Sequence, residues 1–584
     1  MNIQPENDLE HFCQILSVAF NTNEKVLKKY KEKIVTLPKE SIKKVLPQLT
    51  MKVSHENLYI RNMIVQMLTE TGKEYFQQVY FALHPYLCDD GEKSTMAREI
   101  AITIRKEHPQ VAEDADIFID GMVSCAITWF EQWMHSLEIA ASENRIGNIQ
   151  NVDYILNERF NDFENPRCEL DQLFVRLYQD IIDEASSLFE QDDPKSTQLM
   201  WDKLKTLYAS LKERMNMLSV IFVDKISPKL VKKKNFNLSV PGYNGMLSSV
   251  KPIMDVLETQ QHPRCVYFES NDGVQHKFLL KGNEDLRSDE RLMQFFALIN
   301  GVLPKKITKK KEDVYVARYT IVPLTKNVGL IEWFTGADTF HQLVAENRER
   351  HGIEKNIESI RIAQMVAPDF SQETMLQKIE LFNVISNEFK AMELFESMWL
   401  KALNPSIWMV RAQRFTVSYA LMAMVGYIIG LGDRHPSNIM IQRDTGKVVH
   451  IDFGDSFDAA TLRSVFPEKV PFRLTRMVVN ALEGSSSSGL FKEMCIKVMQ
   501  VIRSNNGLLL NHLGIFVEES QDDFGKDSTN KRDPYLLERC EKKLFGREFY
   551  SEEVSVEYQV EMLIGIAENP ENYMQHYPGW CPFW

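Results

Sequence analysis

Apolar positions in the first 220 or so residues recur at intervals of three and four. The segment NLYIRNMIVQMLTETGKEYFQQVYFALH, residues 57–84, is representative, with few glycines and no alternation of apolar and polar residues. This spacing is typical of amphipathic helices that bury one face. Paired helices of this kind predict the end of a helical solenoid followed by a compact helical bundle.

Three tryptophans fall within these predicted helices. Trp129 and Trp133 belong to AITWFEQWMHSLEIAA, and Trp201 belongs to STQLMWDKLKTLYASLKERM. Large aromatic side chains on amphipathic helices usually pack in the core or between helices. We therefore expect these tryptophans to be packing residues on the basis of their local pattern.

The pattern changes after Lys234. As far as about Trp333, short β-prone runs (RCVYFES, HKFLLKG, YVARYTIVPL) alternate with turns such as Asn271-Asp272-Gly273, and one helix, SDERLMQFFALINGVL, intervenes. Helices return from TFHQLVAENR onward, so the pattern predicts an α+β chain with a sheet-rich lobe in its middle. SSSSG, residues 485–489, and QDDFGKDSTNKRD, residues 521–533, are predicted to be loops.

Composition places the chain among folded, non-membrane proteins of several domains. Its 584 residues allow three or four domains, and with 44% hydrophobic and 26% charged residues it has no apolar run long enough to span a bilayer. The polar start MNIQPENDLE is unlike a signal or transit peptide. Eight cysteines without a CxxC pair fit reduced thiols of the cytosol or nucleus, and the net charge of -13 argues against nucleic acid as a partner.

Two lysine clusters stand out against this acidic background. They are Lys232 to Lys234 and Lys309 to Lys311. We expect solvated loop charge at both, with a membrane or an acidic partner as the alternative.

The stretch GLGDRHPSNIMIQRDTGKVVHIDFGDSF, residues 430–457, contains the parts of a phosphotransfer site. Two β-prone runs flank Arg443-Asp444-Thr445-Gly446, which predicts a hairpin that brings Asn438 beside Asp452. A carbonyl oxygen and a carboxylate placed together suit Mg²⁺ shared with substrate phosphates. The stretch therefore predicts a nucleotide-dependent phosphotransferase.

The order of residues in this stretch differs from that of ordinary protein kinases in one respect. Asp433 precedes Asn438 by five positions and Asp452-Phe453-Gly454 follows, as in the kinase template, but His435 comes after Asp433 instead of before it. From there an imidazole can donate to a phosphoryl oxygen or orient the nucleophile. Each residue alone is an ordinary cap or turn residue, and the joint spacing carries the prediction.

A kinase also needs a cation for the phosphates and a carboxylate that holds this cation. In HKFLLKGNEDLRSDERLMQ a predicted strand ends at Lys281, and Glu284, Asp289 and Glu290 follow before or at the start of a helix. A lone lysine at a strand end is usually solvated. In a chain with the stretch above, Lys281 is the candidate for the phosphates.

The motifs GLGDRHPSNIM and HIDFGDSF resemble those of the phosphatidylinositol 3-kinase-related protein kinases. FPEKVPFRLTRMVVNALE and the final GWCPFW resemble the target of rapamycin (TOR) group within that family. The resemblance implies a FAT-like solenoid end at 1–118, an FRB-like four-helix bundle at 119–215, a kinase domain at 216–549 and a FATC tail at 550–584. Within the kinase domain it implies an N-lobe at about 235–333 and a C-lobe at about 334–549.

The resemblance also implies a role for each site residue. Asp433 would accept the proton of the substrate hydroxyl, His435 would stabilise the transferring phosphoryl group, and Asn438 and Asp452 would hold Mg²⁺ or Mn²⁺. Lys281, steadied by Glu284, would contact the ATP phosphates. The remaining implied nucleotide contacts are Asp289 and Tyr319 in the inner adenine pocket, Trp333 stacked on the adenine, the Phe334 backbone at the hinge and Met440 on the pocket floor.

The substrate class depends on the loop DFGDSFDAATLRSVFPEKVPFRLT, residues 452–475. Lipid kinases need cations there for an anionic headgroup, whereas this loop has Asp455 and Asp458 early and only Arg463, Lys469 and Arg473 as cations. We therefore expect a serine/threonine protein kinase, and the resemblance to the TOR group implies a role in nutrient and growth signalling. A phosphoinositide kinase and a catalytically weak scaffold are the alternatives.

The resemblance implies partners as well. Residues 358–408 are similar to the TOR insertion that docks a WD-repeat propeller, with helices that close the C-lobe as the alternative. Large scaffold subunits of TOR complexes are also expected. Trp201 with Asp202 would form the exposed corner of a recognition surface. Binding of an immunophilin–rapamycin complex is expected to be weak, because Ala141, Arg145 and Lys205 occupy positions that matter for the drug.

Several positions depart from the TOR pattern. Ile253 follows Pro252 where a phosphate-contacting Ser is usual, so one hydroxyl contact to ATP is missing, and the scaffold alternative stays open. Met574 and His576 replace cysteines, so Cys581 has no disulfide partner in the tail. The aromatic tip, Trp580, Phe583 and Trp584, is expected to pack on the kinase or to touch a membrane.

The long HEAT solenoid expected of TOR is not in this sequence, which fits a fragment, a truncated gene model or a short protein. The expected location is the cytoplasm, at endomembranes such as the vacuole or lysosome, or the nucleus.

Overall fold

The computed structural model describes residues 8–20, 28–29, 33–87, 91–191, 193–259, 261–303, 314–366, 373–522 and 535–584. The chain divides into two compact units. The sheet unit comprises residues 24–290 and 319–333, and the C-terminal unit comprises residues 1–23, 291–318 and 334–584. The lysines at 309–311 and residues 523–533 of the second predicted loop lie outside the described residues.

The sheet unit begins with helices, as the periodicity predicts. They are α3 (Lys39–Ile42), α4 (Leu46–Met51), α5 (Leu58–Gly72), α6 (Phe76–Leu83), α7 (Glu92–Glu107) and α8 (Pro109–Ala126). The side chain of Asn57 caps α5 by accepting from the N–H groups of Tyr59 and Ile60. Helix α8 continues through residue 119, where we placed the start of the bundle.

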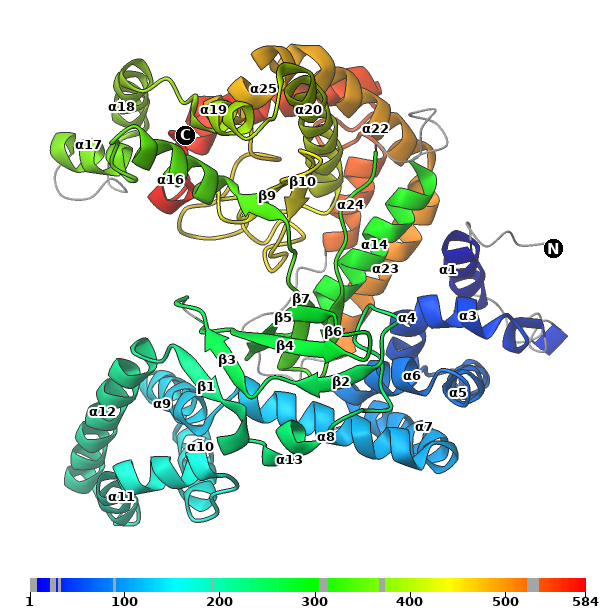
Figure 1. Ribbon diagram of the computed structural model, residues 1–584, viewed down its shortest axis with the longest axis vertical. Coiled ribbons are helices and arrows are strands. Elements are labelled where there is room, and N and C mark those ends of the chain that lie inside the picture. Colours follow the sequence, from blue (N-terminus) through cyan, green and yellow to red (C-terminus); the bar gives the residue numbers. More distant parts are fainter. Residues whose placement is uncertain are drawn as a thin grey trace. The chain divides into compact units, whose positions relative to one another are not determined.

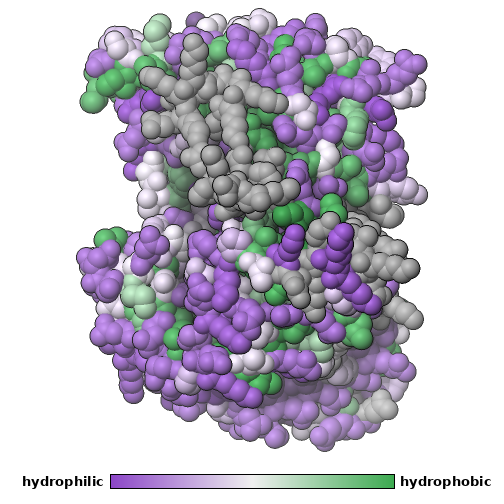
Figure 2. All heavy atoms as spheres, turned by 90° about the vertical axis from the view of Figure 1, so that its right-hand side faces the viewer, coloured by the Kyte–Doolittle hydropathy of each residue, from purple (hydrophilic) through white to green (hydrophobic). Residues whose placement is uncertain are grey.

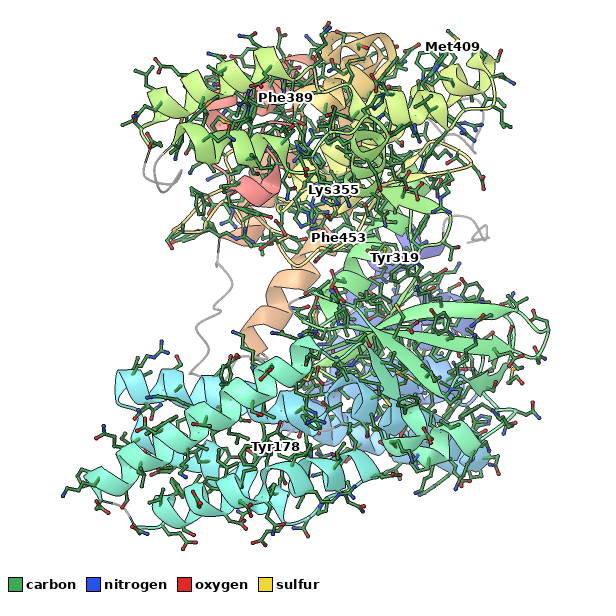
Figure 3. The ribbon with its side chains drawn as sticks, turned by 60° about the vertical axis from the view of Figure 1, so that its left-hand side comes forward. Tyr178, Tyr319, Lys355, Phe389, Met409 and Phe453 are labelled. Atoms are coloured by element: carbon green, nitrogen blue, oxygen red, sulfur yellow. The ribbon has the colours of Figure 1, made fainter. Side chains whose placement is uncertain are left out.

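Four helices follow and pack against one another in a bundle (Figure 1). They are α9 (Trp129–Ile146), α10 (Ile149–Phe163), α11 (Glu169–Phe189) and α12 (Pro194–Asn216). Trp129 and Trp133 are buried in its core against Phe174, and Figure 3 shows Tyr178 among the same helices. Their predicted packing role is confirmed. Trp201 is half-buried at the edge of this core instead of fully exposed.

The middle of the chain forms a seven-stranded antiparallel sheet with the order β1-β3-β4-β5-β7-β6 and with β2 paired to β4. The strands are β1 (Val220–Phe222), β2 (Leu247–Val250), β3 (Ile253–Val256), β4 (Arg264–Ser270), β5 (Gln275–Gly282), β6 (Ile321–Pro323) and β7 (Val328–Glu332). Phe118 of α8 packs on Phe268 of β4, with 5.5 Å between ring centroids. Of the predicted β-prone run 315–324, only Ile321–Pro323 forms a strand.

One lysine of the first cluster is not solvated loop charge as predicted. Helix α13 (Pro228–Lys232) precedes Lys233, whose Nζ lies 2.6 Å from Oδ1 of the fully buried Asp114. The Asn237 backbone N–H and side-chain amide donate to the other carboxylate oxygen. A buried carboxylate needs such partners, which a local sequence pattern does not reveal.

Helix α14 (Arg287–Val302) follows β5, and its residues from Arg291 belong to the C-terminal unit. This unit is otherwise mainly helical, around the three-stranded sheet β10-β9-β8. Its other elements are α1 (Asp8–Phe20), β8 (Ala337–Thr339), α16 (Phe340–Arg350), α17 (Ile357–Met365), α18 (Met375–Glu388), α19 (Glu393–Leu400), α20 (Pro405–Ile428), β9 (Ile439–Gln442), β10 (Val448–His450), α21 (Arg476–Ala481), α22 (Lys492–Ser504), α23 (Asn506–Asp522), α24 (Leu536–Leu544), α25 (Val556–Glu568), α26 (Pro570–Tyr573) and η8 (Pro578–Trp580).

Two predicted loops of this unit are partly helical. The SSSSG segment lies in the short helical turns η6 (Glu483–Ser485) and η7 (Ser487–Phe491), and α23 extends to Asp522. Polar composition alone predicted loops there, but packing of Phe491 and neighbouring side chains decides the local conformation.

The aromatic tip of the chain is buried in the C-terminal unit. Trp580 and Phe583 join a core cluster with Tyr573 and Met574 of the tail and with side chains of α17 and α18, including Phe382. The tip therefore packs on the kinase-like part, which is one of its two predicted roles. Among the described residues no helix is long and apolar enough to cross a membrane, and Figure 2 shows hydrophobic side chains in small separate areas on the face it presents.

Candidate active site

The predicted hairpin is present. Strands β9 and β10 pair antiparallel with Ile439 opposite His450, and the Ile451 N–H donates to the Asn438 carbonyl at 3.1 Å. Gly446 closes the turn with φ of 78°, and a Cβ there would lie 2.9 Å from the Arg411 carbonyl oxygen of α20. Only glycine fits this position, and the hairpin brings Asn438 beside the segment that begins at Ile451, as predicted.

The loop before the hairpin holds Asp433 in an unusual backbone conformation. Asp433 has φ of 55°, and its N–H donates to Oε1 of Glu468 at 2.8 Å. The side-chain amide of the buried Asn438 donates to the Asp433 carbonyl at 3.0 Å. This leaves the side-chain oxygen of Asn438 as the atom suited to a cation.

Arg434 ties the loop of Asp433 to the segment of Asp452. Its buried guanidinium donates to the carbonyls of Gly432 at 2.7 Å and Ile451 at 2.9 Å, and also to that of Asp452. Asp452 itself has φ of 60°. Arg434 is not among the predicted site residues, because an arginine in a polar loop gives no local sign that it is buried.

Phe453, the residue after Asp452, is buried against Phe296 of α14 with 5.4 Å between ring centroids (Figure 3). This contact fixes the backbone on one side of Asp452.

His435 lies beside Asp433, with 3.8 Å between Nε2 and Oδ2. Its Nδ1 accepts from the Ser437 N–H at 3.2 Å, so the neutral ring carries its proton on Nε2. Burial lowers the pKa of His435, and the charge of Asp433 opposes this effect. A neutral imidazole with a donor on the Asp433 side is suited to the predicted phosphoryl contact.

In the sheet unit, Lys281 and Glu284 form the predicted pair. Lys281 lies in β5 opposite Gly329 of β7, and its Nζ is 3.1 Å from Oε1 of Glu284. The two side chains are 13% and 20% exposed, so the ammonium group is held in a largely enclosed place. The Glu284 N–H donates to the Asn327 carbonyl, which anchors the carboxylate.

The other candidate nucleotide residues of this unit are mostly enclosed. Asp289 at the start of α14 and Tyr319 are both 8% exposed. Trp333 follows β7 and donates its backbone N–H to the Lys277 carbonyl at 3.0 Å. The Lys277 ammonium lies 3.8 Å from the Trp333 ring centroid, which makes this indole a cation-binding face as well as a candidate adenine contact.

Three further predicted positions have a clear place in the fold. Ile253 begins β3 opposite Phe222 and is 44% exposed, so an apolar side chain stands where a hydroxyl was expected. Phe334 is the first residue of the C-terminal unit after Trp333, as a hinge residue would be. Met440 lies in β9 opposite Val449.

The cations of the loop 452–475 are largely engaged within the fold. Arg463 pairs with Asp455, and Arg473 is buried and donates to the carbonyls of Trp580 at 2.6 Å and Cys581 at 2.8 Å. Lys469 is exposed. Two of the three cations of this loop, Arg463 and Arg473, therefore already have partners within the fold.

The acidic residues of the loop are also paired, which corrects one part of our reasoning. Besides the pair of Asp455, Asp458 accepts from Arg539 at 3.0 Å and from Lys543 at 2.7 Å, both on α24. Free negative charge in the loop thus does not argue for a protein substrate. The part of the argument that stands is that the loop has only three cations, of which Arg463 and Arg473 are engaged within the fold.

The residues present fit a nucleotide with a divalent cation. Among the described residues no cluster of three or more His, Cys, Asp or Glu side chains could hold a metal ion alone. Asn438 and Asp452 offer two oxygens, which suits a cation that also binds phosphates.

Comparison with known proteins identifies three domains. The model for the FKBP12-rapamycin binding domain matches residues 121–213, that for phosphatidylinositol 3- and 4-kinases matches residues 275–525, and that for FATC matches residues 553–584.

Curated relatives span the whole chain. It is 31% identical to the serine/threonine-protein kinase TOR2 of Saccharomyces cerevisiae over 92% of its length, and 31% identical to tor1 of Schizosaccharomyces pombe over 100%. It spans 24% and 28% of these two proteins. In fold, the open conformation of CtTel1 matches all of this chain and 20% of its own, with a TM-score of 0.70 at 18% identity.

Proposed function

Because the chain belongs to the target of rapamycin (TOR) kinases, whose FRB, kinase and FATC domains it carries, we propose that it is a serine/threonine protein kinase. It transfers the γ-phosphate of ATP to protein substrates in growth signalling. The observation that carries this proposal is the β9–β10 hairpin, which sets Asn438 beside the start of the Asp452 segment in the spacing of a kinase.

Each site residue has a role in this reaction. Bound ATP would supply the phosphoryl group. Asn438 and Asp452 would hold a divalent cation, Mg²⁺ in our proposal, which would supply positive charge for the phosphates, and Lys281, fixed by Glu284, would contact the phosphates as well.

Asp433 accepts the proton of the substrate hydroxyl, and the Nε2–H of His435 donates to a phosphoryl oxygen. Positioning of the reactants and stabilisation of charge account for most of the rate acceleration, since the transition state of phosphoryl transfer is loose. The protein forms no covalent intermediate in this scheme.

The pairing of Arg463 and burial of Arg473 support a protein substrate over an inositol headgroup. A headgroup with several phosphates needs accessible cations, and two of the three in this loop have partners within the fold.

We propose that the chain takes part in a TOR-type complex with scaffold subunits and a WD-repeat propeller. Exposed apolar side chains of the insertion support a docked partner there; they are Leu376, Trp399, Leu400 and Leu403. Burial of the inner faces of α17 and α18 supports their role in closing the C-lobe as well. The location is the cytoplasm, endomembranes or the nucleus; burial of the aromatic tip favours packing over membrane contact for that segment.

The test is a phosphorylation assay of the full chain with Mg-ATP, a panel of serine/threonine peptides and phosphatidylinositol vesicles. The informative variant is Asp452→Asn, because asparagine tolerates the positive φ of this position and removes only the charge. Asp444→Ala, at the exposed tip of the same hairpin, is the matched control. We expect peptide phosphorylation by the wild type and the control, and its loss in Asp452→Asn.

Two results would contradict the proposal. Lipid product without peptide phosphorylation would make the chain a phosphoinositide kinase. No product on either substrate, in an intact wild-type chain, would favour the scaffold alternative.

A further inference from the structure

Asp433 is held by two residues from outside its own loop. The Tyr577 hydroxyl, from the C-terminal tail, donates to its Oδ1 at 3.3 Å. The buried Glu468 carboxylate accepts from its backbone N–H at 2.8 Å. Both contacts act on a residue with φ of 55°, a conformation that costs free energy and persists only where neighbours hold it.

The tail that carries Tyr577 is fixed by the same loop that follows Asp452. Arg473 donates to the carbonyls of Trp580 and Cys581, and the Lys469 N–H donates to Nε2 of the buried His576 at 3.3 Å. The tail residues that accept these bonds, His576, Trp580 and Cys581, lie on both sides of Tyr577 in the sequence. Its hydroxyl is thus placed by the fold and not by a freely moving chain end.

Gly579 makes this position of the ring possible. A Cβ at residue 579 would lie 2.5 Å from Cε2 of Tyr577. Any larger residue would push the ring away from its present position.

The two carboxylate oxygens of Asp433 have different surroundings. Oδ1 accepts from Tyr577, while Oδ2 lies 3.8 Å from Nε2 of His435. Burial raises the pKa of Tyr577, and the charge of Asp433 raises it further, so the hydroxyl keeps its proton and is the donor. A hydrogen bond to one oxygen fixes the rotation of the carboxylate and leaves the other for a substrate.

We propose that Tyr577 is a positioning residue for phosphoryl transfer, which holds Oδ1 of Asp433 so that Oδ2 faces the substrate hydroxyl. This inference rests on the proposed kinase function and adds the C-terminal tail to its active site. Catalysis depends steeply on such orientation, because the reacting atoms must meet in one geometry.

The experiment compares Tyr577→Phe with the wild-type chain in initial-rate peptide phosphorylation at varied ATP and varied peptide. Loss of one hydrogen bond to a charged group predicts a fall in kcat of about 10-fold, with the KM for ATP unchanged. Tyr573→Phe is the matched control, since it removes another tyrosine hydroxyl of the same tail, from a ring that packs on Phe382. We expect wild-type kinetics from it.

A second measurement separates positioning from general packing. If Tyr577 acts through Asp433, adding Tyr577→Phe to Asp433→Asn should cause no further loss in single-turnover phosphorylation. Thermal unfolding of each variant shows whether the tail remains packed.

The outcomes are distinct. A selective fall in kcat that vanishes in the Asp433→Asn background supports the inference. Unchanged kcat in Tyr577→Phe, an equal fall in Tyr573→Phe, or an additive loss in the double variant overturns it and leaves the kinase proposal intact. A wild-type chain that phosphorylates no peptide overturns both.

Discussion

Arg348 is the residue of the C-terminal unit whose replacement we expect to be most damaging. It lies near the end of α16 and is 1% exposed. Its guanidinium donates to Glu393 of α19 at 2.9 Å, to Glu358 of α17 at 2.8 Å and to the Lys355 carbonyl at 2.8 Å. One buried cation therefore joins three helices.

Arg348→Met keeps the apolar stem and removes the charge. The carboxylates of Glu358 and Glu393, which are 6% and 12% exposed, would then be buried without their cation. Removing one member of a buried ion pair costs about 3–5 kcal/mol. Arg361→Met is the control, because Arg361 pairs with Glu388 on the surface and such pairs contribute about 0–1 kcal/mol.

The loss should also depend on pH. In Arg348→Met the two buried carboxyl groups favour their protonated form, so their pKa values rise in the folded state. The folded variant then binds more protons than the unfolded one, and its stability falls as pH rises. The deficit relative to wild type should be smaller near pH 5 than at pH 8.

Hydrogen exchange measured on the full chain, in peptides from α16 and α17, gives the local free energy of opening for each variant. The reasoning is wrong if Arg348→Met loses no more than Arg361→Met, or if its deficit is the same at both pH values.

Three further predictions concern other parts of the chain. Burial raises the pKa of Glu468 from 4.5 to about 7, so the folded state binds more protons than the unfolded state in that interval. Wild type should therefore lose up to about 3 kcal/mol of stability between pH 5 and 8 relative to Glu468→Gln. If thermal unfolding shows the same pH dependence of stability for both proteins, the prediction is contradicted. Immunophilin–rapamycin should bind weakly, because Arg145 and Lys205 are exposed charges, and should bind more tightly to Arg145→Phe with Lys205→Tyr; nanomolar affinity of the wild type in calorimetry would refute the argument. Phe382→Ala should cost about 3–5 kcal/mol and reduce phosphorylation, since its ring packs on Tyr573 and Phe583 of the tail; an unchanged melting temperature would be inconsistent with that packing.

The parts of the site that could be predicted are those encoded locally. The β9–β10 hairpin follows from two β-prone runs around a turn with glycine, and it fixes where Asn438 lies. The pair of Lys281 and Glu284 is three residues apart and needs only a strand end and a turn. Helices and the bundle core followed from periodicity for the same reason.

The parts that could not be predicted depend on residues far apart in the sequence. In the sequence, Arg434 and Glu468 look like surface charges and Tyr577 like a tail aromatic, yet all three hold the loop of Asp433 in place. Asp458 is a further example. We counted it as negative charge that disfavours a lipid headgroup, but Arg539 and Lys543 of α24 already neutralise it. Charge counts along a loop do not reveal which charges already have partners.

The docking of residues 573–583 has a consequence for limited proteolysis of the folded protein. Asp433, Arg473 and the core side chains of α18 have partners among these residues. A protease that cuts within this segment therefore removes the support of the Asp433 loop while most helices stay packed. The proposed kinase activity should then be lost after a single cut, well before the rest of the fold is degraded.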